Sequence, residues 1–150
     1  MRISREQMFM DIAEIVAKRS ACLRNNVGCV IVNHDNNIVA IGYNGPAAGV
    51  PQCRPEQCQA GCDIAIHAED NAILRMPTKY DSFGAPVKYS LYVTVSPCKE
   101  CARLIVQRGD IDKVYYRYPY RISDGIYYLL SKGIKVYKIL TGGIINEERL

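Results

Sequence analysis

Two short segments, residues 67–69 (His-Ala-Glu) and 97–101 (Pro-Cys-Lys-Glu-Cys), constrain the fold of this chain more than any other feature. One histidine and two cysteines are soft ligands that suit tetrahedral zinc with a fourth position left open. The carboxylate of Glu69 is not needed as a ligand, so it can carry protons between a bound water and a substrate. The two segments therefore predict one catalytic zinc site, and the fold must bring them together.

Both segments are predicted at the N-termini of helices. Ser96 is the expected N-cap, and Pro97 suits the first helical position. Cys98 and Cys101 are three residues apart and share a helix face, where unpaired N–H groups and the helix dipole favour the thiolates that zinc needs. The histidine and the glutamate of segment 67–69 are two apart, so they can meet one metal only at the very start of a helix.

The rest of the chain alternates between helical and strand patterns. Ser4 and Gln7 form a capping box in front of a helix that is expected to run to about Ser20. Strands are predicted over 27–32, 38–43, 89–95, 113–116 and 134–139, and helices over 64–76, 97–108 and 123–132. The later strand–helix–strand units should be parallel. The length is typical of one domain and the sequence indicates no internal repeat or domain boundary, so we expect a single domain over residues 1–150. Its expected fold class is α/β, a three-layer α/β/α sandwich with a mixed, roughly five-stranded sheet and a hairpin at one edge.

Composition excludes some classes of protein. No apolar run approaches the ~20 residues of a membrane span, and the charged N-terminus lacks the apolar core of a secretion signal. We therefore expect a cytoplasmic protein, in which seven cysteines indicate metal binding or reduced thiols rather than disulfides. The formal charge of +4 is compatible with an anionic small-molecule substrate.

Each part of the metal motif has a more ordinary interpretation when it stands alone. A lone Cys-x-x-Cys can be a redox pair, His67 a satisfied histidine, and Glu69 a solvated helix charge. The joint pattern has the correct residues in the correct order, with proline before the first cysteine and both halves at helix starts. It favours a catalytic zinc site, in which zinc lowers the pKa of its bound water to about 7 and Glu69 can take up the proton that the water releases.

The chain resembles the deoxycytidylate (dCMP) deaminases. The order H-x-E then P-C-x-x-C is the pattern of zinc nucleobase deaminases in general. Residues 19–28, 43–46, 67–73 and 116–121 carry the more specific resemblance, which runs from about residue 19 to 136. It implies a cytidine deaminase-like fold and zinc-dependent hydrolysis of dCMP to dUMP and ammonia, which supplies dUMP for dTMP synthesis.

The resemblance also implies roles for residues outside the metal motif. Asn44 is expected to contact the deoxyribose and Tyr120 to line the pocket, and a guanidinium suits phosphate because its planar fork binds two oxygens. The predicted substrate-binding residues are Arg24, Asn26, Asn44, Ala68, Ser96, Tyr120 and Arg121.

Regulation and assembly are implied in the same way. Similar enzymes are commonly homohexamers that dCTP activates and dTTP inhibits, with Mg²⁺ bound by the triphosphate. Asn71 and Gly45 are the candidates for such a regulatory site. The expected partners are therefore small-molecule nucleotides and further copies of the chain, not nucleic acids or membranes.

Four further cysteines suggest a second, structural zinc. Some similar enzymes bind one with a cysteine after the first helix and ligands from the long loop, here predicted over residues 47–63, and four thiolates would close a tetrahedral site. The candidate ligands are Cys22, Cys53, Cys58 and Cys62. The chain departs from the pattern at Gln52 and Ala65, where histidine is found in some relatives, and reduced thiols are the alternative. Cys29 alternates with strand residues and is interpreted as a small core residue.

Four alternatives are compatible with parts of the pattern. A tRNA adenosine deaminase shares the metal motif but needs a basic surface for RNA, which residues 141–150 do not provide. A riboflavin-pathway deaminase usually carries a second reductase domain, and dCTP is an alternative substrate. A zinc-stabilised binding module without turnover would leave Glu69 and the open coordination position without a role.

Overall fold

The computed structural model describes residues 1–52, 54–58 and 64–150, with only the backbone of residues 57 and 58. Its helices are α1 (Arg5–Ala17), α2 (Ala68–Leu74), α3 (Lys99–Arg108), α4 (Asp124–Ser131) and the 3₁₀ turn η1 (Pro55–Cys58). Its strands are β1 (Gly28–Asn33), β2 (Ile38–Tyr43), β3 (Gly45–Pro46), β4 (Ala65–Ile66), β5 (Tyr89–Val95), β6 (Ile111–Tyr118), β7 (Lys135–Ile139) and β8 (Ile145–Glu147). Within the described residues, none of the helices combines the length and the apolar character that a membrane crossing requires.

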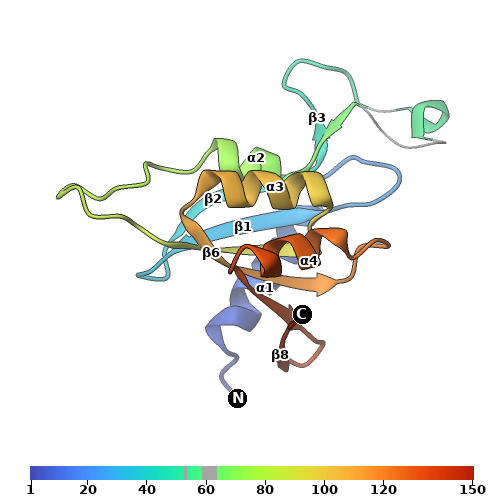
Figure 1. Ribbon diagram of the computed structural model, residues 1–150. Helices are drawn as coiled ribbons and strands as arrows, with labels where there is room; N and C mark the ends of the chain where they lie inside the picture. Colours follow the sequence, from blue (N-terminus) through green and yellow to red (C-terminus); the bar gives the residue numbers. More distant parts are fainter. Residues whose placement is uncertain (53, 59–63) are drawn as a thin grey trace.

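One mixed sheet organises the chain, with the strand order β2-β1-β5-β6-β7-β8 (Figure 1). The hairpin of β1 and β2 is antiparallel and β1 also pairs antiparallel with β5, whereas β5, β6 and β7 are parallel. The predicted mixed sheet with a hairpin at its edge is confirmed. Two features were not predicted: β8 adds a sixth strand antiparallel to β7, and β3 and β4 form a separate two-stranded sheet.

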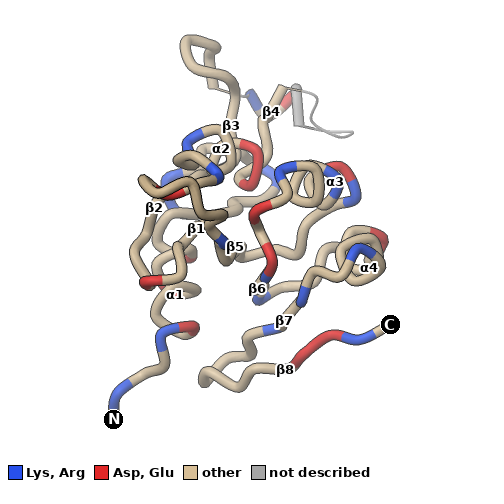
Figure 2. The backbone as a smooth tube through the Cα atoms, turned by 60° about the vertical axis from the view of Figure 1, so that its left-hand side comes forward, with Lys and Arg blue, Asp and Glu red and all other residues tan. Residues whose placement is uncertain are grey.

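The sheet lies between helices on both of its faces, as Figure 2 shows with α1 on one side and α3 and α4 on the other. Buried side chains of α2, α3 and α4 share one hydrophobic cluster with strands β1, β5, β6 and β7. Phe9, Met10 and Ala13 of α1 pack against the opposite face with Tyr92 and Tyr115. The predicted three-layer sandwich is therefore confirmed within the described residues, with α1 on one face and α2, α3 and α4 on the other.

Gly42 allows α2 to lie directly on strand β2. A Cβ atom at this position would overlap the carbonyl oxygen of Ala68 and the amide nitrogen of Ala72, both in the backbone of α2. Backbone atoms cannot move aside as a flexible side chain can. The absence of a side chain at Gly42 thus sets how closely the N-terminus of α2 approaches the sheet.

Two predicted helix starts differ from the structure. Residues 64–67 do not begin a helix, because β4 and an extended His67 precede α2. The N-cap of α3 is Cys98 rather than Ser96, which places Pro97 before the helix instead of at its first position. Propensity alone favoured serine as the cap, but the Ser96 hydroxyl accepts a hydrogen bond from the amide of Tyr120 instead.

The first helix also departs from the prediction. Ser4 caps it by accepting the amide of Gln7 at 3.1 Å, as expected. The Gln7 side chain does not complete the capping box, because its carbonyl oxygen accepts no hydrogen bond from the described residues, while its amide nitrogen donates to Asp11 at 2.6 Å. The helix ends at Ala17, with Lys18 as its C-cap, rather than near Ser20. The chain after Ala17 therefore begins the loop that leads to β1.

Substituting Gly42 tests the close approach of α2 to the sheet. We expect Gly42→Ala to lower the free energy of unfolding by about 1–3 kcal/mol, because overpacking against backbone forces the helix and the sheet apart. Gly45→Ala is the matched control, since a Cβ there meets no atom within 4 Å. Urea denaturation followed by circular dichroism measures both, and equal stability of the two variants would contradict this interpretation.

Candidate metal centre and cavity

The starts of α2 and α3 bring three ligand side chains together. His67 is the N-cap of α2, Cys98 is the N-cap of α3, and Cys101 lies in the first turn of α3. His67 Nδ1 is 3.1 Å from Cys101 Sγ and 3.5 Å from Cys98 Sγ. All three ligand atoms lie within 4.8 Å of one another. The sequence prediction that two helix N-termini converge on one point is confirmed for these residues.

The cluster fits a tetrahedral zinc ion. A nitrogen at about 2.0–2.1 Å and a sulfur at about 2.3 Å from tetrahedral zinc are roughly 3.6 Å apart. The observed nitrogen–sulfur distances of 3.1 and 3.5 Å are close to this separation. The side chains of His67 and Cys98 make no capping hydrogen bond, although both stand at N-cap positions. They are therefore free to bind a metal, and the set supplies three ligands rather than four.

Without metal, the two thiols differ in their proton affinity. A hydrogen bond from Cys101 lowers the pKa of Cys98 to about 4, while that same contact and burial raise the pKa of Cys101. The hydrogen bond with Cys98 raises the pKa of His67 to about 9. The cluster thus contains one thiolate next to groups that keep their protons. A divalent cation can bind such a cluster by displacing those protons.

Glu69 lies in the first turn of α2 and lines the same cavity as two of the ligands. Its exposed fraction is 4%, and burial raises its pKa to about 7. It is not part of the ligand cluster, which consists of His67, Cys98 and Cys101. A buried carboxyl group that titrates near neutral pH is suited to accept and return a proton.

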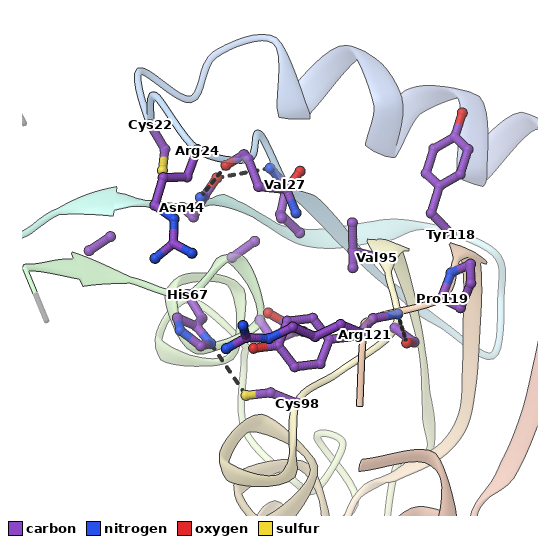
Figure 3. A pocket seen from close by; sticks show the side chains of 16 residues that line it. Cys22, Arg24, Val27, Asn44, His67, Val95, Cys98, Tyr118, Pro119 and Arg121 are labelled. Carbon is purple, nitrogen blue, oxygen red and sulfur yellow. Dashed lines mark hydrogen bonds between the residues drawn. The ribbon is translucent and has the colours of Figure 1, made fainter. Parts of the chain in front are cut away.

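A cavity of about 550 Å³ opens beside the cluster (Figure 3). Its wall combines the metal ligands His67 and Cys98 with aromatic, amide and cationic side chains. Arg24 and Arg121 are the cations, and Glu69 is the acidic residue among those that line it. The lining residues are Cys22, Arg24, Asn25, Val27, Asn44, Ala65, His67, Ala68, Glu69, Val95, Ser96, Cys98, Tyr118, Pro119, Tyr120 and Arg121.

The structure places most of the residues expected to bind substrate in this wall. The six that line the cavity are Arg24, Asn44, Ala68, Ser96, Tyr120 and Arg121. Asn26 is not among the lining residues, whereas its neighbour Asn25 is. Asn71 and Gly45, the regulatory candidates, also lie outside the lining. The side chain of Asn71 donates to the carbonyl of Tyr43 at 2.9 Å and so ties α2 to the end of β2.

Two polar side chains hold the loops of the cavity wall. Asn44 accepts the amide of Val27 at 2.9 Å with Oδ1 and donates to the carbonyl of Asn25 at 2.7 Å with Nδ2. Ser96 accepts the amide of Tyr120 at 2.7 Å, and the guanidinium of Arg121 lies 5.9 Å from the centre of the Tyr120 ring. These side chains fix the backbone that presents the cationic residues.

Several lining residues were missed by sequence reasoning. Asn25, Val27, Val95, Tyr118 and Pro119 line the cavity, and each is a neighbour of a predicted site residue or lies in a segment that carried the resemblance. Their position in the sequence, next to predicted site residues or within these segments, was the signal that could have identified them. Their orientation depends on hydrogen bonds such as that between Asn44 and Val27, which join residues distant in sequence.

The candidates for a second metal are only partly described. Cys22 is half-buried and lines the cavity. Cys53 and Cys62 lie outside the described residues, as does the side chain of Cys58. The binding of a second zinc by these four cysteines therefore stays a prediction.

Comparisons with known proteins agree with this geometry. A sequence model of the family described as "Cytidine and deoxycytidylate deaminase zinc-binding region" matches residues 3–118. ComE operon protein 2 of Bacillus subtilis is 42% identical over 80% of this chain and 62% of its own length. Deoxycytidylate deaminase of Saccharomyces cerevisiae is 34% identical over 91% of this chain and 45% of its own length. The chain thus spans about half the length of these two curated relatives.

A solved structure is similar over nearly its whole length. The crystal structure of dCMP deaminase from the cyanophage S-TIM5, in complex with dCMP and dUMP, superposes with a TM-score of 0.78. It is 35% identical in sequence, and the match covers 92% of this chain and 98% of that one. The helices and strands described above therefore belong to an arrangement found in a solved deaminase.

Replacing one thiol tests the ligand cluster. We expect Cys98→Ser to lower the zinc content by one ion per chain, because a hydroxyl group is a poor substitute for a thiolate in a zinc site. Cys29→Ala is the matched control, since Cys29 is fully buried in the core and outside the cluster. Elemental analysis of the purified proteins measures both, and unchanged zinc in Cys98→Ser would refute the assignment of this ligand.

Proposed function

Because this chain belongs to the cytidine and deoxycytidylate deaminase family, we propose that it hydrolyses dCMP to dUMP and ammonia. The observation that carries the proposal is the position of Glu69, which is buried beside the His67–Cys98–Cys101 cluster and lines a cavity with two arginines in its wall. The solved relative was crystallised with dCMP and dUMP, the substrate and product of this reaction.

Different residues of the chain carry out different parts of the proposed reaction. His67, Cys98 and Cys101 would hold zinc, which when bound supplies a nucleophilic hydroxide at neutral pH. Glu69 accepts a proton beside the cluster and returns it to the ring nitrogen of the cytosine. It then takes the proton of the hydroxyl group newly attached at C4 and passes it to the amino group, which leaves as ammonia. Its burial keeps bulk water away from the carboxyl group, so the proton stays at the reacting atoms.

Arg24 and Arg121 support the choice of a nucleotide as the substrate. Both guanidinium groups belong to the cavity wall that also contains Glu69. A guanidinium can bind two phosphate oxygens with paired hydrogen bonds. We assign the 5′-phosphate of dCMP to these two residues, while Asn44, Ala68, Ser96 and Tyr120 surround the nucleoside.

Further properties belong to the proposal through family membership. They are activation by dCTP and inhibition by dTTP with Mg²⁺, assembly into a homohexamer, and a cytoplasmic location. Asn71 and Gly45 stay the candidates for the regulatory site, and Asn26 stays a candidate near the phosphate because it adjoins Asn25 of the cavity wall.

An ammonia-release assay tests the activity. We expect release from dCMP, and we expect Glu69→Ala and Glu69→Gln to lower kcat by about 10²–10⁴-fold or more while zinc stays bound, because the proton carrier is lost. Glu100→Gln is the control: Glu100 lies in the first turn of α3 but is exposed. Including dCTP, deoxycytidine and a tRNA anticodon stem, each with and without dCTP and dTTP, separates the alternative substrates and effectors. Absence of dCMP deamination under all of these conditions would refute the function.

Zinc stoichiometry tests the structural site. We propose a second zinc bound by Cys22, Cys53, Cys58 and Cys62, because four thiolates form the closed set of a structural site. The full chain should then contain two zinc ions, of which Cys98→Ser retains one. A single zinc ion in the unsubstituted protein that disappears in Cys98→Ser would show that these cysteines are reduced thiols.

A further inference from the structure

The segment of residues 18–27, between α1 and β1, presents cavity residues without the support of a helix or a strand. Arg24 and Asn25 are both exposed, and both line the cavity. Figure 3 shows Arg24 and Cys22 on this segment, across the cavity from Cys98. A backbone of this kind holds a side chain in place only where other contacts fix it.

The end of the segment is fixed by Asn44, the residue that follows β2. Its side chain binds the carbonyl of Asn25 and the amide of Val27, and its own amide donates to the carbonyl of Val27 at 3.3 Å. Asn44 is 8% exposed, so these bonds are shielded from competing water. Both the side chain and the backbone of Asn44 therefore serve as an anchor.

The start of the segment is fixed to the same anchor by Ser20. The Ser20 hydroxyl donates to the carbonyl of Asn44 at 2.8 Å and accepts the amide of Cys22 at 3.2 Å. Ser20 is buried and does not line the cavity. Leu23 and Arg24 thus lie between two attached residues, Cys22 and Asn25, of which the first is tied to Asn44 through Ser20 and the second directly.

We infer that Ser20 is a positioning residue for recognition of the nucleotide phosphate, acting through the backbone of Asn44 and Cys22 to hold Arg24 toward the cavity. The inference rests on the proposed function, because it assigns the phosphate to Arg24. Ser20 does not touch the substrate, and no atom of the ligand cluster bonds to it.

The physical reason is the entropy of the loop. Without the hydroxyl group, the Asn44 carbonyl and the Cys22 amide each lose a hydrogen-bond partner, and the first attachment to Asn44 is lost. Arg24 must then be ordered when the ligand binds, and this cost weakens binding. The groups that carry out the chemistry lie on α2 and α3, so the effect falls on KM and not on kcat.

Steady-state kinetics on the full-length, zinc-loaded chain test the inference. Ser20→Ala removes two hydrogen bonds and should raise KM for dCMP and the inhibition constant of dUMP by at least about two- to twelvefold, which is the effect of a single neutral hydrogen bond. The value of kcat and the inhibition constant of deoxyuridine, which lacks the phosphate, should stay within about twofold. Ser20→Thr retains the hydroxyl group and should restore the KM of the unsubstituted chain.

A double-mutant cycle separates positioning from a general structural effect. In an Arg24→Ala background, adding Ser20→Ala should leave KM unchanged, because the residue that it positions is already absent. Equal loss of dUMP and deoxyuridine binding, additive effects in the cycle, or the same loss in Ser20→Thr would each overturn the inference. If the unsubstituted chain does not deaminate dCMP, the proposed function itself is wrong. If the chain is active and Ser20→Ala does not change KM, only the inference about Ser20 is wrong.

Discussion

The meeting of two helix N-termini over one face of the sheet is the constraint on which the site depends. His67 starts α2 and Cys98 starts α3, and both helices belong to the same hydrophobic cluster. Gly42 sets the distance of α2 from the sheet. Gly125 of α4 does the same for the other ligand segment, since a Cβ there would overlap the backbone of Pro97 and Cys98. Helix packing thus determines the geometry of the metal site, because a shift of either helix moves a ligand.

This arrangement also explains why the ligands stand at N-cap positions. An N-cap usually uses its side chain to satisfy the first amides of the helix. His67 and Cys98 have extended backbones at these positions but leave their side chains free, so the helix starts direct N–H groups and positive potential toward the cluster. That potential favours thiolates. Burial acts in the opposite sense on Glu69 and raises its pKa, which leaves a carboxyl group that can hold a proton near neutral pH.

The sequence predicted those features that depend on residues close together in the chain. It failed for features that depend on contacts between residues distant in sequence. Residue type and spacing sufficed to bring out the cluster of one histidine and two cysteines, and β-branched or alternating apolar runs sufficed to locate the five longer strands. The choice of Ser96 as helix cap was wrong because the amide of Tyr120, far along the chain, takes its hydroxyl group. The start of α2 was placed too early because β4 exists only through its pairing with β3. The short strand β8 was missed for a similar reason, since its residues are exposed and only pairing with β7 defines it.

The groups proposed for catalysis and those proposed for substrate recognition are held by different kinds of contact. The ligands and Glu69 are positioned by packed helices, whose movement would disturb the core. Arg24 and Arg121 lie on loops, and each loop is tied by a buried polar side chain just after a strand: Asn44 follows β2 and Ser96 follows β5. Substitutions in these loops can alter which ligand is bound without changing the separation of the metal ligands. One fold can therefore keep the same hydrolytic chemistry while its substrate changes. This agrees with the sequence, in which the metal motif indicates the chemistry and the surrounding loops indicate the substrate.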